Sequence, residues 1–291
     1  MPGTYSPLRY PGGKTKLSTF LIQVMQANCL TYPIYIEPYA GGAGAALRLL
    51  FEEFVEEVII NDADPRIRAF WGAVTRQPNR FVSYLQDTPL SVEEWRKQRE
   101  IYNRRDLRRP FDLGFATFYL NRTTRSGIIH NGGPIGGFDQ KGNYKIDARF
   151  NRVELARRIC RIGAYADRIQ VSGDDGLSLL RNLNRRSSAS RTLVYIDPPY
   201  YAKGNELYLN QLTHKEHAKL ANYLRSEKNF NWLMTYDDVE QVRHLYAGYS
   251  KIPFSLSYSA HRRKTGNELL IYPANVAIPE RAKASLPAVA A

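Results

Sequence analysis

The sequence predicts an α/β fold in which helices cover both faces of a mainly parallel sheet, with a mainly helical region inserted into the chain. Short apolar runs that end in acidic or glycine-rich turns alternate with helical patterns in two groups, before about residue 65 and after about residue 165. Helical patterns fill the interval between the groups. With 291 residues, 43% of them hydrophobic, the chain can bury a full core, and no low-complexity linker divides it.

The first predicted strand, Ile34-Tyr35-Ile36-Glu37, runs into a loop of small residues that opens a helix. The loop is Pro38-Tyr39-Ala40-Gly41-Gly42-Ala43-Gly44, and the helix is expected at about 45–51. Glycines let the backbone approach a ligand closely, and the start of a helix favours negative or polar groups. The pattern is typical of a cofactor loop, and a tight turn that simply requires small residues is the alternative.

A second strand pattern, residues 58–62, ends in Asp62. Nucleotide-binding folds place a carboxylate on ribose hydroxyls at this distance along the chain. A nicotinamide-dependent dehydrogenase would show the same arrangement. However, Leu47 stands where the third glycine of Gly-x-Gly-x-x-Gly is required, counted from Gly42. The loop therefore departs from the dinucleotide pattern.

Two further segments place polar groups beside predicted helices. The turn-rich segment Leu8-Arg9-Tyr10-Pro11-Gly12-Gly13-Lys14 precedes an amphipathic pattern over residues 17–25. A third strand pattern over 169–172 leads to Asp174 and Asp175, and leucines continue the segment as a helix. Lys14 could reach a carboxylate, and either aspartate could accept a hydrogen bond from an aromatic amine. A solvated lysine and a helix N-cap are the ordinary roles of such residues.

The buried strand pattern Leu193-Val194-Tyr195-Ile196 ends in Asp197-Pro198-Pro199-Tyr200. Two prolines fix φ and offer no N–H, so the turn displays a carboxylate, a bare carbonyl and an aromatic ring. The exocyclic N6 of adenine is a poor nucleophile because its lone pair is delocalised into the ring. Asp197 and the Pro198 carbonyl could each accept one N6–H while Tyr200 stacks on the base. Plain turn packing at the end of a strand is the alternative.

The organisation follows from these patterns. A catalytic domain is expected over 1–65 and 150–280, an inserted domain over 66–149 and a disordered tail over 281–291. The helical patterns of the insert cover 66–76, 79–86, 92–103 and 112–122, and a glycine-rich stretch follows over 126–142. After the insert come a helix near 151–166 and strands near 231–235 and 254–259.

The charge balance favours a nucleic-acid partner. With 41 Lys and Arg against 28 Asp and Glu, the formal charge is +13, which favours polyanions through counterion release. The excess gathers in the insert at Arg96, Lys97, Arg99, Arg104, Arg105, Arg108, Arg109, Arg122 and Arg125, interleaved with Tyr102, Phe115, Phe118 and Tyr119. Cations hold phosphates and aromatic rings stack on bases, although roughly half of these arginines are expected to be solvated helix faces. A second basic run, His261-Arg262-Arg263-Lys264, is expected to form a phosphate-contacting hairpin.

Taken together, the motifs and their order resemble the Dam-like, α-class DNA adenine-N6 methyltransferases, which use S-adenosylmethionine. The shared motifs are Tyr10-Pro-Gly-Gly-Lys14, Glu37-Pro-Tyr-Ala-Gly-Gly-Ala-Gly44, Asp62, Phe118-Tyr-Leu-Asn-Arg122 with Ser126-Gly127, Asp197-Pro-Pro-Tyr200, Ser257-Tyr-Ser-Ala260 and Asn267-Glu-Leu-Leu-Ile271. The resemblance implies a Rossmann-like class I methyltransferase sheet with an inserted target-recognition domain. It also implies site-specific methyl transfer to adenine N6 in double-stranded DNA after base flipping.

The resemblance also implies a role for each matching residue. Tyr10 and Lys14 line the cofactor, and Asp62 holds its ribose. The methionine part lies in the loop formed by Glu37, Pro38, Tyr39, Gly41, Gly42 and Gly44, which is one residue longer than the commonest pattern, so the contacting glycine stays open. One of Asp174 and Asp175 meets the cofactor's adenine, and Asp175 is favoured because the leucines then fall at helical offsets behind it. Asp197, Pro198, Pro199 and Tyr200 are the catalytic group.

The departure from the family concerns specificity. Members that methylate GATC carry Gly-Leu-x-Arg after the Asn-Arg element, and its arginine reads guanine. This chain has Ser126-Gly127-Ile128-Ile129-His130, and a neutral imidazole cannot supply that bidentate fork. We therefore expect a preferred site other than GATC, with base contacts from residues 123–144. The expected DNA contacts are Arg104, Arg105, Arg108, Arg109, Arg122, Arg125, His130, Asn131, Arg262, Arg263 and Lys264.

Three other functions are compatible with the sequence: an RNA adenine-N6 methyltransferase, a catalytically silent DNA-binding module, and a nicotinamide-dependent dehydrogenase. The intact Asp62, Asp197 and Tyr200 disfavour a silent module. Cys29 and Cys160 are isolated and the five histidines show no ligand spacing, so no metal is expected. No apolar run approaches the ~20 residues of a membrane span. We expect a cytoplasmic, nucleoid-associated protein of a bacterial or phage-infected cell, with a restriction endonuclease as a possible partner.

Overall fold

The computed structural model describes most of the chain. The described residues are 5–9, 17–127, 129, 132–183, 185, 188–201, 212–227, 229–259 and 263–287, and for 256–259 and 263–265 the description covers the backbone. Five predicted site residues lie outside these ranges: Tyr10, Lys14, His130, Asn131 and Arg262.

The described strands form one seven-stranded sheet in the order β3-β2-β1-β4-β5-β7-β6. The strands are β1 (Ile34–Glu37), β2 (Glu57–Asn61), β3 (Ile169–Ser172), β4 (Thr192–Ile196), β5 (Asn231–Asp237), β6 (Ser250–Ser259) and β7 (Arg263–Tyr272). The first five are parallel, and β7 runs antiparallel between β5 and β6. Because β1 pairs with β2 on one side and β4 on the other, the order reverses there, and ligands bind open α/β sheets at such a point.

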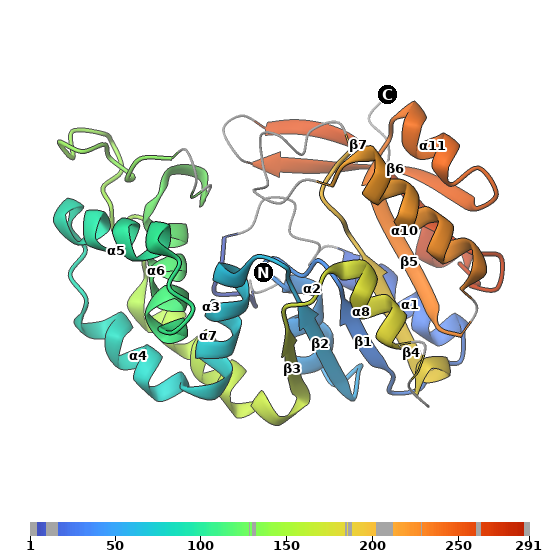
Figure 1. Ribbon diagram of the computed structural model, residues 1–291, viewed down its shortest axis with the longest axis horizontal. Helices are drawn as coiled ribbons and strands as arrows, with labels where there is room; N and C mark the ends of the chain where they lie inside the picture. Colours follow the sequence, from blue (N-terminus) through green and yellow to red (C-terminus); the bar gives the residue numbers. More distant parts are fainter. Residues whose placement is uncertain are drawn as a thin grey trace.

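Helices cover both faces of the sheet (Figure 1), which confirms the predicted fold class. Adjacent residues of a strand point to opposite faces, so Tyr35 and Ile36 enter different apolar clusters. One face packs against α1 (Ser18–Ala27), α2 (Gly44–Phe51) and α12 (Glu280–Lys283). The other packs against α8 (Gly176–Leu183), α10 (His214–Ser226) and α11 (Glu240–Leu245). The sheet therefore lies between two apolar layers, and the polar residues at its strand ends lie at the edge between them.

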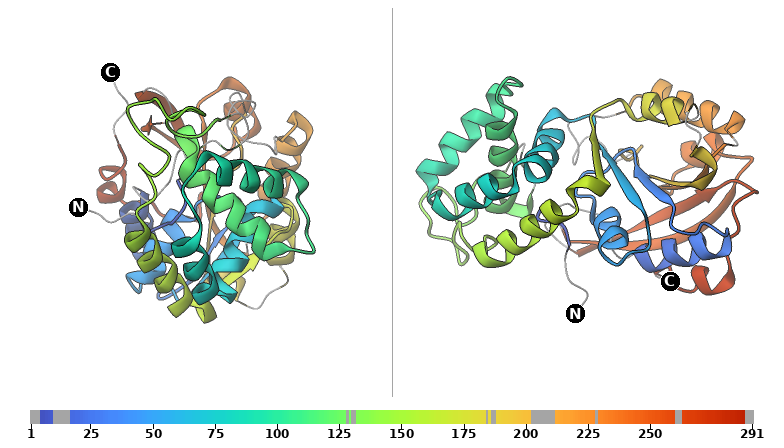
Figure 2. Two further views of the ribbon diagram at one scale, coloured as in Figure 1. Left: turned by 90° about the vertical axis from the view of Figure 1, so that its left-hand side faces the viewer. Right: turned by 90° about the horizontal axis from the view of Figure 1, so that it is seen from below.

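The inserted helices lie beside the sheet (Figures 1 and 2). They are α3 (Pro65–Arg76), α4 (Pro78–Asp87), α5 (Val92–Arg104) and α6 (Pro110–Thr123), and α7 (Arg152–Ala164) returns the chain to β3. Proline occupies the first position of α3, α4 and α6, and Ser91 caps α5 through the Glu94 N–H. These local signals explain why α2 to α7 begin and end within two residues of the predicted bounds.

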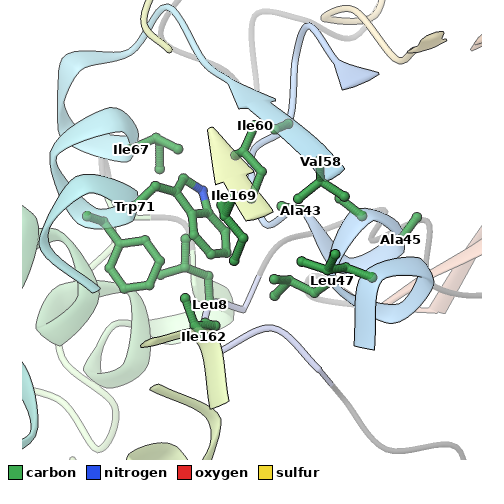
Figure 3. Close-up of a cluster of buried hydrophobic side chains, with 14 of the residues drawn as sticks. Leu8, Ala43, Ala45, Leu47, Val58, Ile60, Ile67, Trp71, Ile162 and Ile169 are labelled. Carbon is green, nitrogen blue, oxygen red and sulfur yellow. The ribbon is translucent and has the colours of Figure 1, made fainter. Parts of the chain in front are cut away.

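A continuous apolar cluster joins the insert to the sheet. Trp71 of α3 is fully buried among side chains from β2, β3, α2 and α7 (Figure 3). The opposite side of α3 packs against α6, and a Cβ at Gly114 would lie 2.5 Å from the Ala69 carbonyl oxygen. Only glycine permits this close approach of α6 to α3. Helix α3 therefore belongs to the packing of both regions.

Two expectations are wrong. The described part of the predicted tail 281–291, residues 281–287, is ordered, because α12 buries Ala282 against α1 and the Ser255 N–H donates to the Pro287 carbonyl. The aromatic residues interleaved with arginine do not face a partner. Tyr102, Phe115, Phe118 and Tyr119 are all buried in the core of the insert. Their spacing is that of a buried helix face, which the charge count obscured.

Candidate active site

Polar side chains gather where the parallel strands end. Glu37 closes β1, Asp62 follows β2, Asp197 follows β4 and Asp237 closes β5. Parallel strands bring their carboxyl ends to one edge of the sheet, so these four acids share that edge. The Asp197-Pro198-Pro199-Tyr200 turn and the glycine loop are therefore neighbours on the adjacent strands β4 and β1.

Each end of the Asp197–Tyr200 turn is held by side chains of β5 and β7. The Thr235 hydroxyl donates to Asp197 Oδ1 at 2.7 Å. The Tyr200 hydroxyl donates to the Glu268 carboxylate of β7, and the ring is 7% exposed. The next N–H, that of Tyr201, donates to Asp237 Oδ1 at 2.9 Å. The turn is thus fixed in place by β5 and β7 before any ligand binds.

Hydrogen bonds from β2 and α3 shape the glycine loop. Gly41 and Ala43 have φ of 47° and 44°, a conformation that glycine adopts without strain and alanine rarely adopts. The Trp71 indole N–H donates to the Gly41 carbonyl at 2.9 Å. The Ala40 N–H donates to the Asn61 carbonyl at 2.9 Å. The backbone of the loop is therefore held at both its edges while Gly44 begins α2.

The Glu37 carboxyl is buried beneath this loop. It accepts from the Tyr35 hydroxyl and from the Ala46 N–H in the first turn of α2, both at 3.1 Å. Burial raises the pKa of Glu37 to about 8, and these two hydrogen bonds oppose the shift. A cationic group bound beside this buried acid would favour its ionised form.

The Asp62 carboxylate binds two backbone donors, the Gly41 N–H at 3.0 Å and the Asp64 N–H at 2.9 Å. These contacts fix its rotamer and connect the end of β2 to the glycine loop. Burial raises the pKa of Asp62 to about 7. Its position beside the loop fits the predicted ribose contact.

The two aspartates after β3 differ in their contacts. Asp175 accepts from the Ser178 N–H at 3.0 Å and caps α8, whereas Asp174 accepts from the Ser172 hydroxyl at 3.1 Å. Both are exposed. The capping role was the ordinary alternative for Asp175, and the choice between the two for a cofactor contact stays a prediction.

Asn61, the fully buried last residue of β2, was not predicted as a site residue. Its Nδ2 donates to the carbonyls of Pro38 and Asp174 at 2.7 and 3.0 Å, and its Oδ1 accepts from the Asp174 N–H at 2.9 Å. Asn61 therefore ties together the loops after β1 and β3. An amide that ends an apolar strand directly before Asp62 was the available signal.

Four arginines predicted to bind DNA lie around the turn between α5 and α6: Arg104, Arg105, Arg108 and Arg109. Arg104 Nη2 lies 3.3 Å from Glu100 Oε2 and its side chain is 74% exposed. Arg108 Nε lies 3.0 Å from Asp106 Oδ1 and its side chain is 90% exposed. Two of the four arginines therefore already pair with a carboxylate close to them in sequence. Such exposed pairs contribute little to stability.

Arg122, near the carboxyl end of α6, has different surroundings. Its Nε atom is buried without a hydrogen-bond partner among the described residues. The charged groups that lower the pKa of its guanidinium are three other arginines, Arg9, Arg158 and Arg149. Burial, followed by these like charges, lowers the pKa of Arg122 to about 9. We call these four residues the arginine cluster.

Arg9 was not predicted as a site residue. Its backbone is clamped to α6, since its N–H donates to Asn121 Oδ1 and its carbonyl accepts from Asn121 Nδ2, both at 2.7 Å. Its guanidinium donates to the Thr124 carbonyl at 3.1 Å. The Asn121-Arg122 pair of the family motif therefore connects the amino-terminal segment to the insert. Arg125 is exposed in the turn that follows α6.

The remaining predicted residues contribute less. For Arg263 and Lys264 the structure gives the backbone, in β7. Among the described residues, no group of three or more His, Cys, Asp or Glu side chains could hold a metal ion. Within the same part of the chain, every helix is too short or too polar to cross a membrane.

Comparisons with known proteins identify the family of the chain. The chain is similar to the type II methyltransferase M.CviBI of Paramecium bursaria Chlorella virus NC1A, with 22% identity over 276 residues, 90% of this chain and 95% of the relative. Two solved structures of the rRNA methyltransferase aviRa from Streptomyces viridochromogenes cover 92% of this chain and 88% of theirs. Each is 16% identical, with TM-scores of 0.38 and 0.37. Residues 10–265 match the D12 class N6 adenine-specific DNA methyltransferases, so the chain belongs to this family.

Proposed function

We propose that the protein transfers a methyl group from S-adenosylmethionine to adenine N6 in double-stranded DNA, at a specific site and after base flipping. The observation that carries the proposal is the placement of Asp197, fixed by Thr235 at the end of β4, beside the glycine loop at the end of β1. Membership of the D12 class supports the reaction and the DNA substrate.

The residues at the sheet edge fit S-adenosylmethionine. When bound, it supplies an electrophilic methyl group on a sulfonium. Positive φ at Gly41 opens the loop backbone to close approach, and Glu37 offers a buried carboxylate beneath it for a cationic part of the molecule. Asp62 would hold the ribose hydroxyls, and Asp174 or Asp175 the adenine amine. Tyr10 and Lys14 keep their implied role in lining the cofactor.

Asp197 and the Pro198 carbonyl would accept the two N6–H groups of the target adenine. This orients the nitrogen lone pair toward the methyl group, so catalysis consists mainly of alignment and polarisation. A base inside the duplex cannot reach Asp197, so it must leave the stack, at a cost of a few kcal/mol. Tyr200, held by Glu268, would pack against the extruded base with Pro199 beside it.

The arginine cluster would bind the DNA backbone. Arg122 is half-buried with its Nε fully buried, the charged groups that lower its pKa are arginines, and a DNA phosphate beside the cluster would offset their repulsion. Contacts from the α5–α6 turn, from Arg125, His130 and Asn131, and from Arg262 to Lys264 complete the proposed DNA surface. The insert of residues 66–149 would then be the target-recognition domain, with residues 123–144 selecting a site other than GATC.

A restriction endonuclease partner is proposed because M.CviBI is a type II methyltransferase. The proposed setting is the cytoplasm of a bacterial or phage-infected cell, on its DNA.

The test is transfer of labelled methyl from S-adenosylmethionine to unmethylated duplex DNA, to RNA and to protein in parallel, followed by nucleoside analysis. We expect N6-methyladenine in DNA. Label that appears only in RNA adenine would favour the alternative substrate, and no transfer to any of the three would favour a silent DNA-binding module. Modification mapping of the product DNA would then identify the recognition sequence.

A further inference from the structure

Thr235 and Tyr195 lie behind Asp197 in the sheet. Because β4 and β5 are parallel with Ile196 beside Met234, Thr235 is the β5 neighbour of Asp197. Thr235 is fully buried and Tyr195 is nearly so. Tyr195 precedes Asp197 by two residues and therefore points to the same face of the sheet. Three polar side chains thus meet inside an apolar layer.

Their hydrogen bonds form a directed chain. The Thr235 hydroxyl lies 2.7 Å from Asp197 Oδ1 and 2.6 Å from the Tyr195 hydroxyl. A carboxylate only accepts, so the single hydroxyl proton of Thr235 goes to Asp197. The Tyr195 proton must then be donated to Thr235 Oγ1. Hydrogen bonds in such a chain polarise and strengthen one another in a low-dielectric interior.

We propose that Thr235, itself oriented by Tyr195, is a positioning residue for Asp197 in the methyl transfer. It fixes the rotation of the carboxylate and favours its accepting form, which the adenine N6–H requires. The inference rests on the proposed function. Thr235 touches neither reacting atom, so it acts through Asp197 alone.

The adjacent residues of β5 support a bracing role for the end of this strand. Asp237 accepts the Tyr201 N–H at 2.9 Å, directly after the catalytic turn. Tyr236, between them, bonds to the buried His217, whose ring centroid lies 4.9 Å from that of Tyr201. Consecutive residues of one strand thus hold the turn at both ends.

The experiment measures kcat for methylation of duplex DNA at saturating substrates, and the Kd for S-adenosylmethionine and for DNA. Thr235→Val keeps the shape and removes the hydroxyl, and we expect kcat to fall about tenfold to 100-fold, the scale of a misplaced catalytic group. Both Kd values should stay within twofold of wild type. Thr235→Ser should restore most of the rate. The matched control is Thr117→Val, another fully buried threonine, whose hydroxyl bonds to the Leu113 carbonyl of its own helix. It should leave kcat unchanged.

Tyr195→Phe is a second variant, for the case that Thr235→Val does not fold. It removes the outer hydroxyl, and a smaller fall in kcat with unchanged Kd values is expected. A kcat for Thr235→Val, or for Tyr195→Phe, equal to that of wild type would overturn the inference while the proposed function stands. A wild-type protein that does not methylate DNA adenine would overturn both.

Discussion

The ionisable groups at the sheet edge and at the carboxyl end of α6 differ in whether the protein supplies them with hydrogen-bond partners. At the sheet edge, Glu37 and Asp62 each accept two hydrogen bonds from backbone or hydroxyl donors. In the arginine cluster, Arg122 is surrounded by like charge and its Nε has no partner among the described residues. The difference teaches that the protein supplies hydrogen-bond donors to both acids, whereas for Arg122 we propose that a DNA phosphate supplies the missing negative charge.

The largest effect is expected for a substitution at the sheet edge, which should lower turnover and leave DNA affinity unchanged. Asp197→Ala removes one of the two acceptors for the adenine amine, and we expect turnover to fall by about 100-fold or more. The Kd for DNA should stay near the wild-type value, because the arginine cluster lies on the insert side. The measurement is single-turnover methylation beside fluorescence anisotropy with a duplex. Turnover within threefold of wild type would remove Asp197 from the chemistry.

The second effect tests the arginine cluster. Arg122→Met keeps much of the side-chain volume and removes the charge, so we expect DNA affinity to fall by about tenfold, near the 1.4 kcal/mol expected of one charge-assisted contact. The slope of log K against log salt should fall by about one unit. The same variant should unfold at an equal or higher temperature, since it removes an uncompensated buried charge. Weaker folding with unchanged DNA binding would mean that Arg122 serves the fold.

The third effect concerns Glu37 and the dependence of stability and cofactor binding on pH. A folded-state pKa of about 8 for Glu37, above its ordinary 4.5, means that the folded protein holds this proton more tightly than the unfolded chain. The free energy of unfolding should therefore fall as the pH rises from 4.5 toward 8. Glu37→Gln should flatten this dependence in urea unfolding without ligand. Glu37→Gln should also weaken S-adenosylmethionine binding most at and above pH 8, where the wild-type carboxyl is ionised. An unchanged pH profile would contradict the assignment.

The smallest effect is expected for the exposed arginines. Joint replacement of Arg104, Arg105, Arg108 and Arg109 by Gln should weaken DNA binding on all sequences alike. The salt slope should fall by less than the roughly one unit expected for Arg122→Met, and well short of the roughly four units that four phosphate contacts would give, because the exposed arginines are solvated and two of them already pair with local carboxylates. A larger loss than for Arg122→Met would reverse the comparison between exposed and buried arginines.

Local patterns predicted most of the fold. Strand β1 and helices α2 to α7 follow from apolar periodicity, proline starts and caps, which are properties of a few adjacent residues. The catalytic turn and the glycine loop were found for the same reason. Asn61 and Thr235 were missed because their roles depend on neighbours 23 and 38 residues away in sequence. Arg122 was found as a charge, but its burial could not be deduced, because arginine count does not reveal which cations lack partners.

Helix α3 determines where the insert can be replaced by that of another protein without disturbing the glycine loop. It supplies Trp71, whose indole holds the Gly41 carbonyl, and it also packs against α6. A chimaera that replaced residues 77–150 would leave that indole in place. One that began at Pro65 would remove it and release one edge of the glycine loop. Under the proposed roles, new recognition segments are best joined after α3, at Gln77, because the Trp71 indole then keeps its hydrogen bond to the glycine loop.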